Sequence, residues 1–313
     1  MLNAHPQVAY RFEPFHRGKK SKTLQSLLSR LRESEFGPEE TAALYRELLI
    51  ANAQTEKPPF FHKTNTRNRG RNLLWPVARS VPPANGLFQW LYTPRGHPPL
   101  IFKEVTQTAT MRALLEKTAI PIAFLVRSPF GTVDSLLRGQ ASGKMPTGRF
   151  TVLGNLVRAH DPALYDRYEG HFDDLSDAQK NALLWRIDVE AAVQAMHAVG
   201  RGVTVTFERM CDDAHTEMQK ICAEFGLKYH DAIRAFIDKL YALDGNASTD
   251  HFVGDRYFSV FRNPHRQREQ WRNTLPDAAY EEVLAVVDDS PAFRRLAEQG
   301  GWLHVTPGTT AKA

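Results

Sequence analysis

An arginine directly after an apolar run, with a serine eight positions later, is the pair of residues with the clearest chemistry in this sequence. The run Ile120–Val126 leads into Arg127, and Ser135 follows in what reads as the next helix. A guanidinium presents a planar fork of N–H donors that matches a phosphate or sulfate group, and a hydroxyl can add a further hydrogen bond. We therefore predict that Arg127 and Ser135 bind one anion.

The residues between them are suited to open a helix beside that anion. Ser128 is placed to cap the helix, and Pro129 fits its first turn, where a backbone N–H is not needed. The N-terminus of a helix that follows a parallel strand faces the carboxyl edge of the sheet and favours anions. The expected site thus combines a strand end, a helix N-terminus and two polar side chains.

Strands and helices alternate over much of the chain, which predicts an α/β fold with a parallel sheet and right-handed crossovers. We expect strands at residues 8–13, 100–103, 120–126 and 202–207. Helical patterns cover residues 23–33, 38–51, 110–117, 177–199, 212–225, 277–287 and 292–299, with a further helix from Pro129. Residues 57–99 are rich in Pro, Asn, Arg and Gly, so we expect an irregular surface excursion there.

Composition sets broad limits on the function. The 313 residues include 42% hydrophobic and 24% charged positions, enough for one large domain or two small ones. The formal net charge of +5 suits an anionic ligand without requiring nucleic acid. Cys211 and Cys222 do not form a disulfide framework or a zinc motif, and no apolar run is long enough to cross a bilayer. We expect a cytoplasmic protein with no metal site and no membrane partner.

The stretch from residue 122 to residue 135 resembles the sulfotransferases that use 3′-phosphoadenosine 5′-phosphosulfate (PAPS). In that family a strand, an arginine, a short turn and a serine eight positions after the arginine bind the 3′-phosphate of PAPS. Arg127 and Ser135 occupy those two positions. The resemblance implies a three-layer α/β fold with a parallel sheet flanked by helices, similar to the P-loop nucleotide kinases.

Further segments match the family in the same order along the chain. Lys103 ends a strand that precedes the arginine strand, and residues 203–208 resemble a later strand that ends in an acidic residue. Residues 217–227 resemble the helix that follows it. The segment Arg266–Leu275, which includes Trp271, resembles the basic C-terminal loop that covers the nucleotide. The resemblance implies that Lys103, Arg266 and Trp271 contribute to the donor site, although each also fits an ordinary structural role.

The opening of the chain resembles the acceptor side of bacterial and carbohydrate-type sulfotransferases. The family pattern places Glu13 and His16 near the acceptor, where either side chain could take a proton from a hydroxyl. The alternative is a solvated carboxylate at a strand end and a loop histidine. The basic residues Arg17, Lys19 and Lys20 fit either donor binding or a solvated loop.

The family's Gly-rich loop for the 5′-phosphosulfate has no counterpart in these 313 residues. Residues 18–21 read Gly-Lys-Lys-Ser but lack a preceding buried strand. We therefore expect a single sulfotransferase-like domain at residues 1–305 that is incomplete at its N-terminus, with a start assigned too late or a fragmentary coding sequence. Insertions at about 57–99 and 139–175 would shape acceptor choice, and residues 306–313 would form a disordered tail.

Three functions remain open at this point. The first is transfer of a sulfuryl group from PAPS to a hydroxyl or amine of a small-molecule or carbohydrate acceptor. The second is a non-catalytic nucleotide-binding protein of the same fold. The third, which the sequence favours least, is a basic nucleic-acid-binding module that uses residues 16–22 and 67–71 as phosphate contacts. The sequence indicates neither the acceptor nor the oligomeric state.

Overall fold

The computed structural model describes residues 1–17, 21–55, 69–105, 107–242 and 264–303, and they form a mixed α/β structure in which helices predominate. The strands are β1 (Ala9–Phe12), β2 (Leu100–Lys103), β3 (Ala123–Val126) and β4 (Val203–Thr206). The helices up to β4 are α1 (Pro14–Arg17), α2 (Lys22–Glu33), α3 (Pro38–Leu49), α4 (Arg69–Ser80), α5 (Pro82–Tyr92), α6 (Thr108–Lys117), α7 (Pro129–Ala141), α8 (Leu153–His160), α9 (Pro162–Tyr168) and α10 (Asp177–Val199). Those after β4 are α11 (Phe207–Asp212), α12 (Ala214–Glu224), α13 (Asp231–Tyr241), α14 (Pro264–Thr274), α15 (Asp277–Val287) and α16 (Pro291–Gly300).

The strands pair in parallel, but they form two small sheets. β1 pairs with β2, with Ala9 opposite Leu100, and β3 pairs with β4, with Ala123 opposite Val203. The expected parallel pairing is therefore present, whereas one continuous sheet in a three-layer arrangement is not found among the described residues. Alternation of strands and helices predicts parallel strands, but it does not specify which strands are neighbours. That order depends on long-range contacts.

Capping residues explain why several predicted helices have their predicted bounds. Ser176 and Gln179 form a reciprocal capping box at the start of α10, and Gly200 ends the helix with a φ of 66°. The side chain of Ser128 accepts a hydrogen bond from the backbone of Gly131, and Pro129 occupies the first turn of α7. Local sequence signals therefore define both ends of α10 and the start of α7.

Two segments predicted to be irregular are helical where the structure describes them. Residues 69–80 and 82–92 form α4 and α5, and residues 264–274 form α14 rather than a loop. Residues 57–99 were predicted to be irregular from their content of Pro, Asn, Arg and Gly, and Arg266–Leu275 was predicted to be a loop from the family resemblance; neither criterion excludes a helix. Pro82 and Pro264 begin their helices, and a proline in the first turn removes no intrahelical hydrogen bond.

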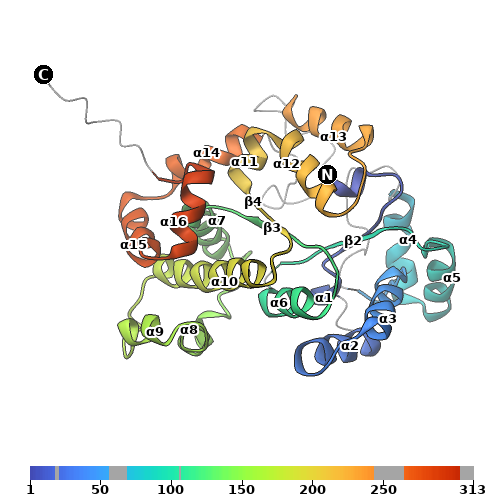
Figure 1. Cartoon of the computed structure of the whole chain (residues 1–313), viewed down its shortest axis with the longest axis horizontal. Helices are drawn as coiled ribbons and strands as arrows, with labels where there is room; N and C mark the ends of the chain where they lie inside the picture. Colours follow the sequence, from blue (N-terminus) through green and yellow to red (C-terminus); the bar gives the residue numbers. More distant parts are fainter. Residues whose placement is uncertain (18–20, 56–68, 106, 243–263, 304–313) are drawn as a thin grey trace, which may run out of the picture.

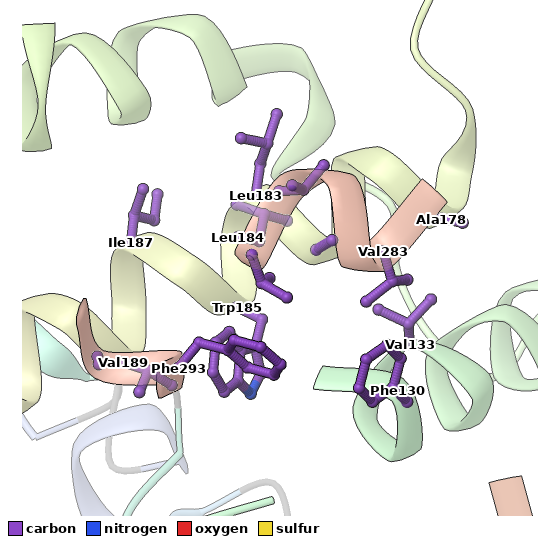
Figure 2. Close-up of a cluster of buried hydrophobic side chains, with 14 of the residues drawn as sticks. Phe130, Val133, Ala178, Leu183, Leu184, Trp185, Ile187, Val189, Val283 and Phe293 are labelled. Carbon is purple, nitrogen blue, oxygen red and sulfur yellow. The ribbon is translucent and has the colours of Figure 1, made fainter. Parts of the chain in front are cut away.

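The largest core joins α10 to α7, α15 and α16, and it lies against β3 (Figure 2). Trp185 and Phe293 lie next to each other in this cluster, with ring centroids 6.4 Å apart. Phe130 and Val133 contribute the inner face of α7, and both are fully buried. This core therefore fixes α7, whose N-terminus carries the expected anion site.

Helix α6 connects the two sheets both in the chain and in space. Its residue Leu114 belongs to the core under β2, together with α2 and α3, whereas Leu115 packs against Ala195 and Met196 of α10. In Figure 1 helices α2 to α5 lie at one end of the molecule, and α15 and α16 lie at the other. None of the helices in the described ranges is long and apolar enough to cross a membrane.

Candidate anion-binding site

Arg127 stands where the sequence predicts it, between the end of β3 and the start of α7. Its backbone is held from two sides. The indole Nε1 of Trp185 donates a hydrogen bond of 2.9 Å to the carbonyl oxygen of Arg127. The backbone N–H of Ser128 donates to a carboxylate oxygen of Glu208 at 3.1 Å. These contacts fix the turn from which the guanidinium projects.

The Arg127 side chain lies against the first turn of α7 because residue 131 is a glycine. A Cβ atom at Gly131 would approach within 2.8 Å of Arg127 Nε and within 3.2 Å of Trp271 Cδ1. Ser135 is four residues after Gly131 in the same helix, so the two positions share one face. Arg127 and Ser135 therefore lie on the same side of α7, as the anion site requires, and Ser135 is half-buried there.

The guanidinium of Arg127 is mostly removed from solvent. Its Nη2 donates to the carbonyl oxygen of Gln267 at 3.3 Å, and its central carbon lies 5.1 Å from the centre of the Phe207 ring. The buried Nε has no hydrogen-bond partner among the described residues. Burial lowers the pKa of this guanidinium below its usual value, and the nearby carboxylates of Glu208 and Asp134 partly offset that shift. An incoming anion would supply the missing acceptor and compensating charge.

Glu208 is a buried carboxylate behind this site. Besides the Ser128 backbone, it accepts a hydrogen bond of 2.8 Å from the indole of Trp302, and its residue is only 3% exposed. Burial raises the pKa of Glu208, although the hydrogen bonds from Ser128 and Trp302 act in the opposite direction. Glu208 thus links α11 to the start of α7 and balances part of the charge of Arg127.

Helix α14 forms the other wall of the site. Arg138 of α7 donates to Asp134 at 2.8 Å and, with the Gln270 amide oriented to accept, to Gln270 at 2.9 Å. Arg266 also lies on α14, where it is exposed to solvent. Arg138 is seven positions after Gly131 and shares its helix face, so this face carries two guanidinium groups, a hydroxyl and the Asp134 carboxylate that pairs with Arg138.

Trp271 belongs to the core rather than to the exposed surface of α14. It is 2% exposed and stacks on Phe130, with ring centroids 5.1 Å apart. The guanidinium carbon of Arg272 lies 4.5 Å from the centre of the Trp271 ring. The ring edge that approaches Gly131 therefore forms the back of the site, and burial leaves the ring little free surface for a bound nucleotide.

Two of the remaining predicted residues form a separate group at the carboxyl ends of β1 and β2. Lys103 Nζ donates to Glu13 Oε1 at 3.1 Å, and the Lys103 ammonium also lies 4.9 Å from the centre of the Phe12 ring. The Glu13 side chain is 7% exposed and that of Lys103 is 49% exposed. Glu13 has a φ of 49°, an unusual value for a residue with a side chain. The candidate base is therefore a buried carboxylate that is paired with the candidate donor-binding lysine.

Other basic and catalytic candidates cannot be placed in either group. His16 and Arg17 lie in α1, and the structure describes only their backbone. Lys19, Lys20 and Arg67 lie outside the described residues. No group of three or more His, Cys, Asp and Glu side chains in the described ranges is arranged to hold a metal ion.

Sequence reasoning missed the residues that position Arg127. Gly131 had a usable signal, because a glycine in the first turn of a helix is costly unless a neighbour needs the space. Glu208 was noted only as an acidic residue at a strand end. Trp185 and Trp302 carried no local signal, since the hydrogen bond of Trp185 to Arg127 and that of Trp302 to Glu208 join residues 58 and 94 positions apart.

Comparisons with known proteins give little independent information. No protein-family model matches the chain, and no curated protein matches it. A solved structure that does match is the sulfotransferase domain from the curacin biosynthetic pathway, which is 12% identical with a TM-score of 0.38. That alignment covers 96% of this chain and 91% of the other. A structural match with so low a TM-score and identity carries no argument about function. The function is therefore inferred from the residues of the site.

Proposed function

We propose that this chain is a PAPS-dependent sulfotransferase in which Arg127 and Ser135 bind the 3′-phosphate of the donor. One observation carries the proposal: a largely buried guanidinium, whose Nε has no hydrogen-bond partner among the described residues, lies on the same face of α7 as the Ser135 hydroxyl. A ribose 3′-phosphate would supply acceptor oxygens for the Arg127 guanidinium and the Ser135 hydroxyl, and would add negative charge to that of Glu208 and Asp134. Arg266 would add a cation from the solvent side, and Trp271 would form the wall behind Arg127.

The second group fits the acceptor side of the same reaction. Sulfuryl transfer requires an in-line approach and cations around the equatorial oxygens, as phosphoryl transfer does. In the proposal the Lys103 ammonium turns from Glu13 to the donor and neutralises the charge of the transferred sulfuryl group. The Glu13 carboxylate then accepts the proton of the acceptor hydroxyl. His16, three residues after Glu13, is an alternative base. The acceptor is a small molecule or a carbohydrate.

The binding of adenosine 3′,5′-bisphosphate to wild type and to Arg127→Ala tests the proposal by titration calorimetry. Removal of one charge-assisted contact is expected to cost about 1.5–3 kcal/mol, or roughly a 10- to 150-fold loss of affinity. Arg112→Ala is the matched control, because Arg112 is exposed on α6 and pairs only with Glu116 at the surface in the described structure. Equal affinity of the two variants would contradict the proposal.

A non-catalytic nucleotide-binding protein is the second candidate. It is favoured by the ion pair of the buried Glu13 with the half-exposed Lys103, because this pair occupies both groups that the reaction would use. An assay of sulfuryl transfer from PAPS to a panel of hydroxyl acceptors separates the two functions. Turnover that falls about 100-fold or more in Glu13→Gln, with bisphosphate binding unchanged, indicates the enzyme. Binding without turnover indicates the second candidate.

A further inference from the structure

Helices α4 and α5 form a hairpin at one end of the molecule (Figure 1). The two helices pack on each other and on the segment after α3 through Ala51, Ala53, Ala78 and Phe88, which are all buried. The Gln54 side chain also donates to the Arg79 carbonyl oxygen at 3.0 Å. The inner face of this α4–α5 hairpin, residues 69–92, is therefore covered by the rest of the protein.

The outer face of the α4–α5 hairpin is apolar as well. On α4 and just after it, Leu73, Val77 and Val81 recur every four residues, and they are 78%, 56% and 46% exposed. On α5 the exposed side chains are Leu87 at 58%, Trp90 at 66% and Leu91 at 49%. Helices with apolar residues on two faces are normally buried on both, so this face lacks a cover among the described residues.

The charged residues of this segment have one sign. Residues 69–99 contain Arg69, Arg71, Arg79 and Arg95 and no Asp or Glu, which gives a formal charge of +4. The whole chain carries only +5, so most of its excess charge coincides with this segment. Arg95 is exposed, and the guanidinium carbon of Arg79 lies 5.2 Å from the centre of the Trp75 ring.

We propose that the α4–α5 hairpin binds the surface of an anionic lipid bilayer. Its exposed leucines, valines and tryptophan would enter the boundary between headgroups and acyl chains, and its arginines would contact lipid phosphates. Amphipathic helices that bind in this way combine bulky apolar residues on one face with an excess of basic residues. Tryptophan is also favoured at this depth, because its ring is apolar and its N–H is polar.

The charge pattern argues for lipid and against a second copy of the chain. A symmetric dimer through this face would bring the same arginines of two protomers together, without acidic residues in the segment to pair with them. From the sequence we predict no membrane partner, because no apolar run is long enough to cross a bilayer, and the proposed surface binding departs from that prediction. With 12 and 11 residues, α4 and α5 are too short to cross a bilayer, but they can lie along it.

Flotation with lipid vesicles tests the proposal on the full chain. We expect binding to vesicles of phosphatidylcholine with phosphatidylglycerol, weaker binding at raised salt, and little binding to phosphatidylcholine alone. The double variant Leu73→Ser/Trp90→Ser should lose about tenfold or more of the affinity, because it removes two large apolar side chains from the contact. The control Val152→Ser/Leu303→Ser changes two residues that are 44% and 51% exposed elsewhere and should bind like wild type.

A second readout follows the position of Trp90 itself. Its emission should shift to shorter wavelength when anionic vesicles are added, and Trp90→Phe should abolish the larger part of that shift, since Trp185, Trp271 and Trp302 are buried and Trp75 of α4 is already half-buried. Absence of binding to anionic vesicles, or equal binding by the Leu73/Trp90 variant, would overturn the proposal. Light scattering that finds a dimer dissociated by that variant, without vesicle binding, would assign the face to a second copy instead. None of these outcomes depends on the proposed sulfotransferase activity.

Discussion

The absence of a side chain at residue 131 allows the Arg127 guanidinium to lie against the start of α7. We predict that Gly131→Ala displaces the Arg127 side chain, because the new methyl group would come within 2.8 Å of Nε and 3.2 Å of Trp271. The expected cost is about 1–3 kcal/mol in the free energy of unfolding, together with weaker bisphosphate binding. Urea denaturation measures the first effect and calorimetry the second.

The control for this prediction is Gly86→Ala in α5, where an added methyl group meets no atom within 4 Å. That change should be neutral or slightly stabilising, because alanine favours helix over glycine. If Gly131→Ala behaved like Gly86→Ala in both measurements, the close approach of Arg127 to α7 would be refuted.

Glu208 gives the site a predictable dependence on pH. Burial raises its pKa above the ordinary value of 4.5, so the folded protein holds this proton more tightly than the unfolded chain does. The contribution of Glu208 to stability is therefore complete below pH 4.5 and is lost as pH rises through the folded pKa. Relative to Glu208→Gln, the wild-type free energy of unfolding should fall as pH increases above this value. Parallel curves of stability against pH for the two proteins would refute the prediction.

At the scale of secondary structure, a cluster of ion pairs links α9 and α10 to the turn between α15 and α16. Asp289 accepts a hydrogen bond of 2.7 Å from Arg167 and pairs with Arg186 of α10. The Arg167 hydrogen bond, aided by Arg186, lowers the pKa of Asp289 from 3.8 to about 2, although burial opposes the shift. This carboxylate therefore contributes stability above pH 3.8, and the contribution is lost as pH falls toward 2.

Asp289→Asn should therefore be less stable than wild type at neutral pH, with a deficit that shrinks as pH falls from 3.8 toward 2. Chemical denaturation at a series of pH values measures this difference. Asp231→Asn is the control, because the Asp231 pair with Arg234 is exposed, at 87% and 54%, and such pairs contribute little. A deficit that does not change with pH would show that Asp289 acts through packing rather than through charge.

The elements with strong local signals were predictable, and those defined by distant contacts were not. The bounds of α10 follow from Ser176 and Gly200, and the start of α7 follows from Ser128 and Pro129. In contrast, α4 forms despite Pro76 in its interior, and it packs through Ala78 against α5 and the segment after α3. The position of Arg127 at a strand end was predictable, whereas the Trp185, Glu208 and Trp302 contacts that hold its turn required the three-dimensional structure.

At the scale of the whole molecule, α6 is the element that holds the two sheets in one structure. Leu115 is completely buried between α6 and α10, while its neighbour Leu114 packs into the core under β2. Leu115→Ala would leave a cavity at this junction and should lower the free energy of unfolding by about 2–5 kcal/mol. Urea denaturation followed by circular dichroism measures the loss.

Leu303→Ala serves as the comparison for that prediction, since Leu303 is 51% exposed and its truncation should change stability by about 0.5 kcal/mol or less. Similar stabilities for the two variants would mean that the junction between α6 and α10 contributes little. The two sheets would then be held together by other contacts.

The central claim is that Arg127 recognises the 3′-phosphate itself and not the rest of the nucleotide. The most direct test compares adenosine 3′,5′-bisphosphate with adenosine 5′-phosphate as ligands of wild type and of Arg127→Ala. The account predicts that wild type prefers the bisphosphate by roughly 10- to 150-fold and that most of this preference disappears in the variant. An Arg127→Ala protein that keeps the full preference would contradict the claim.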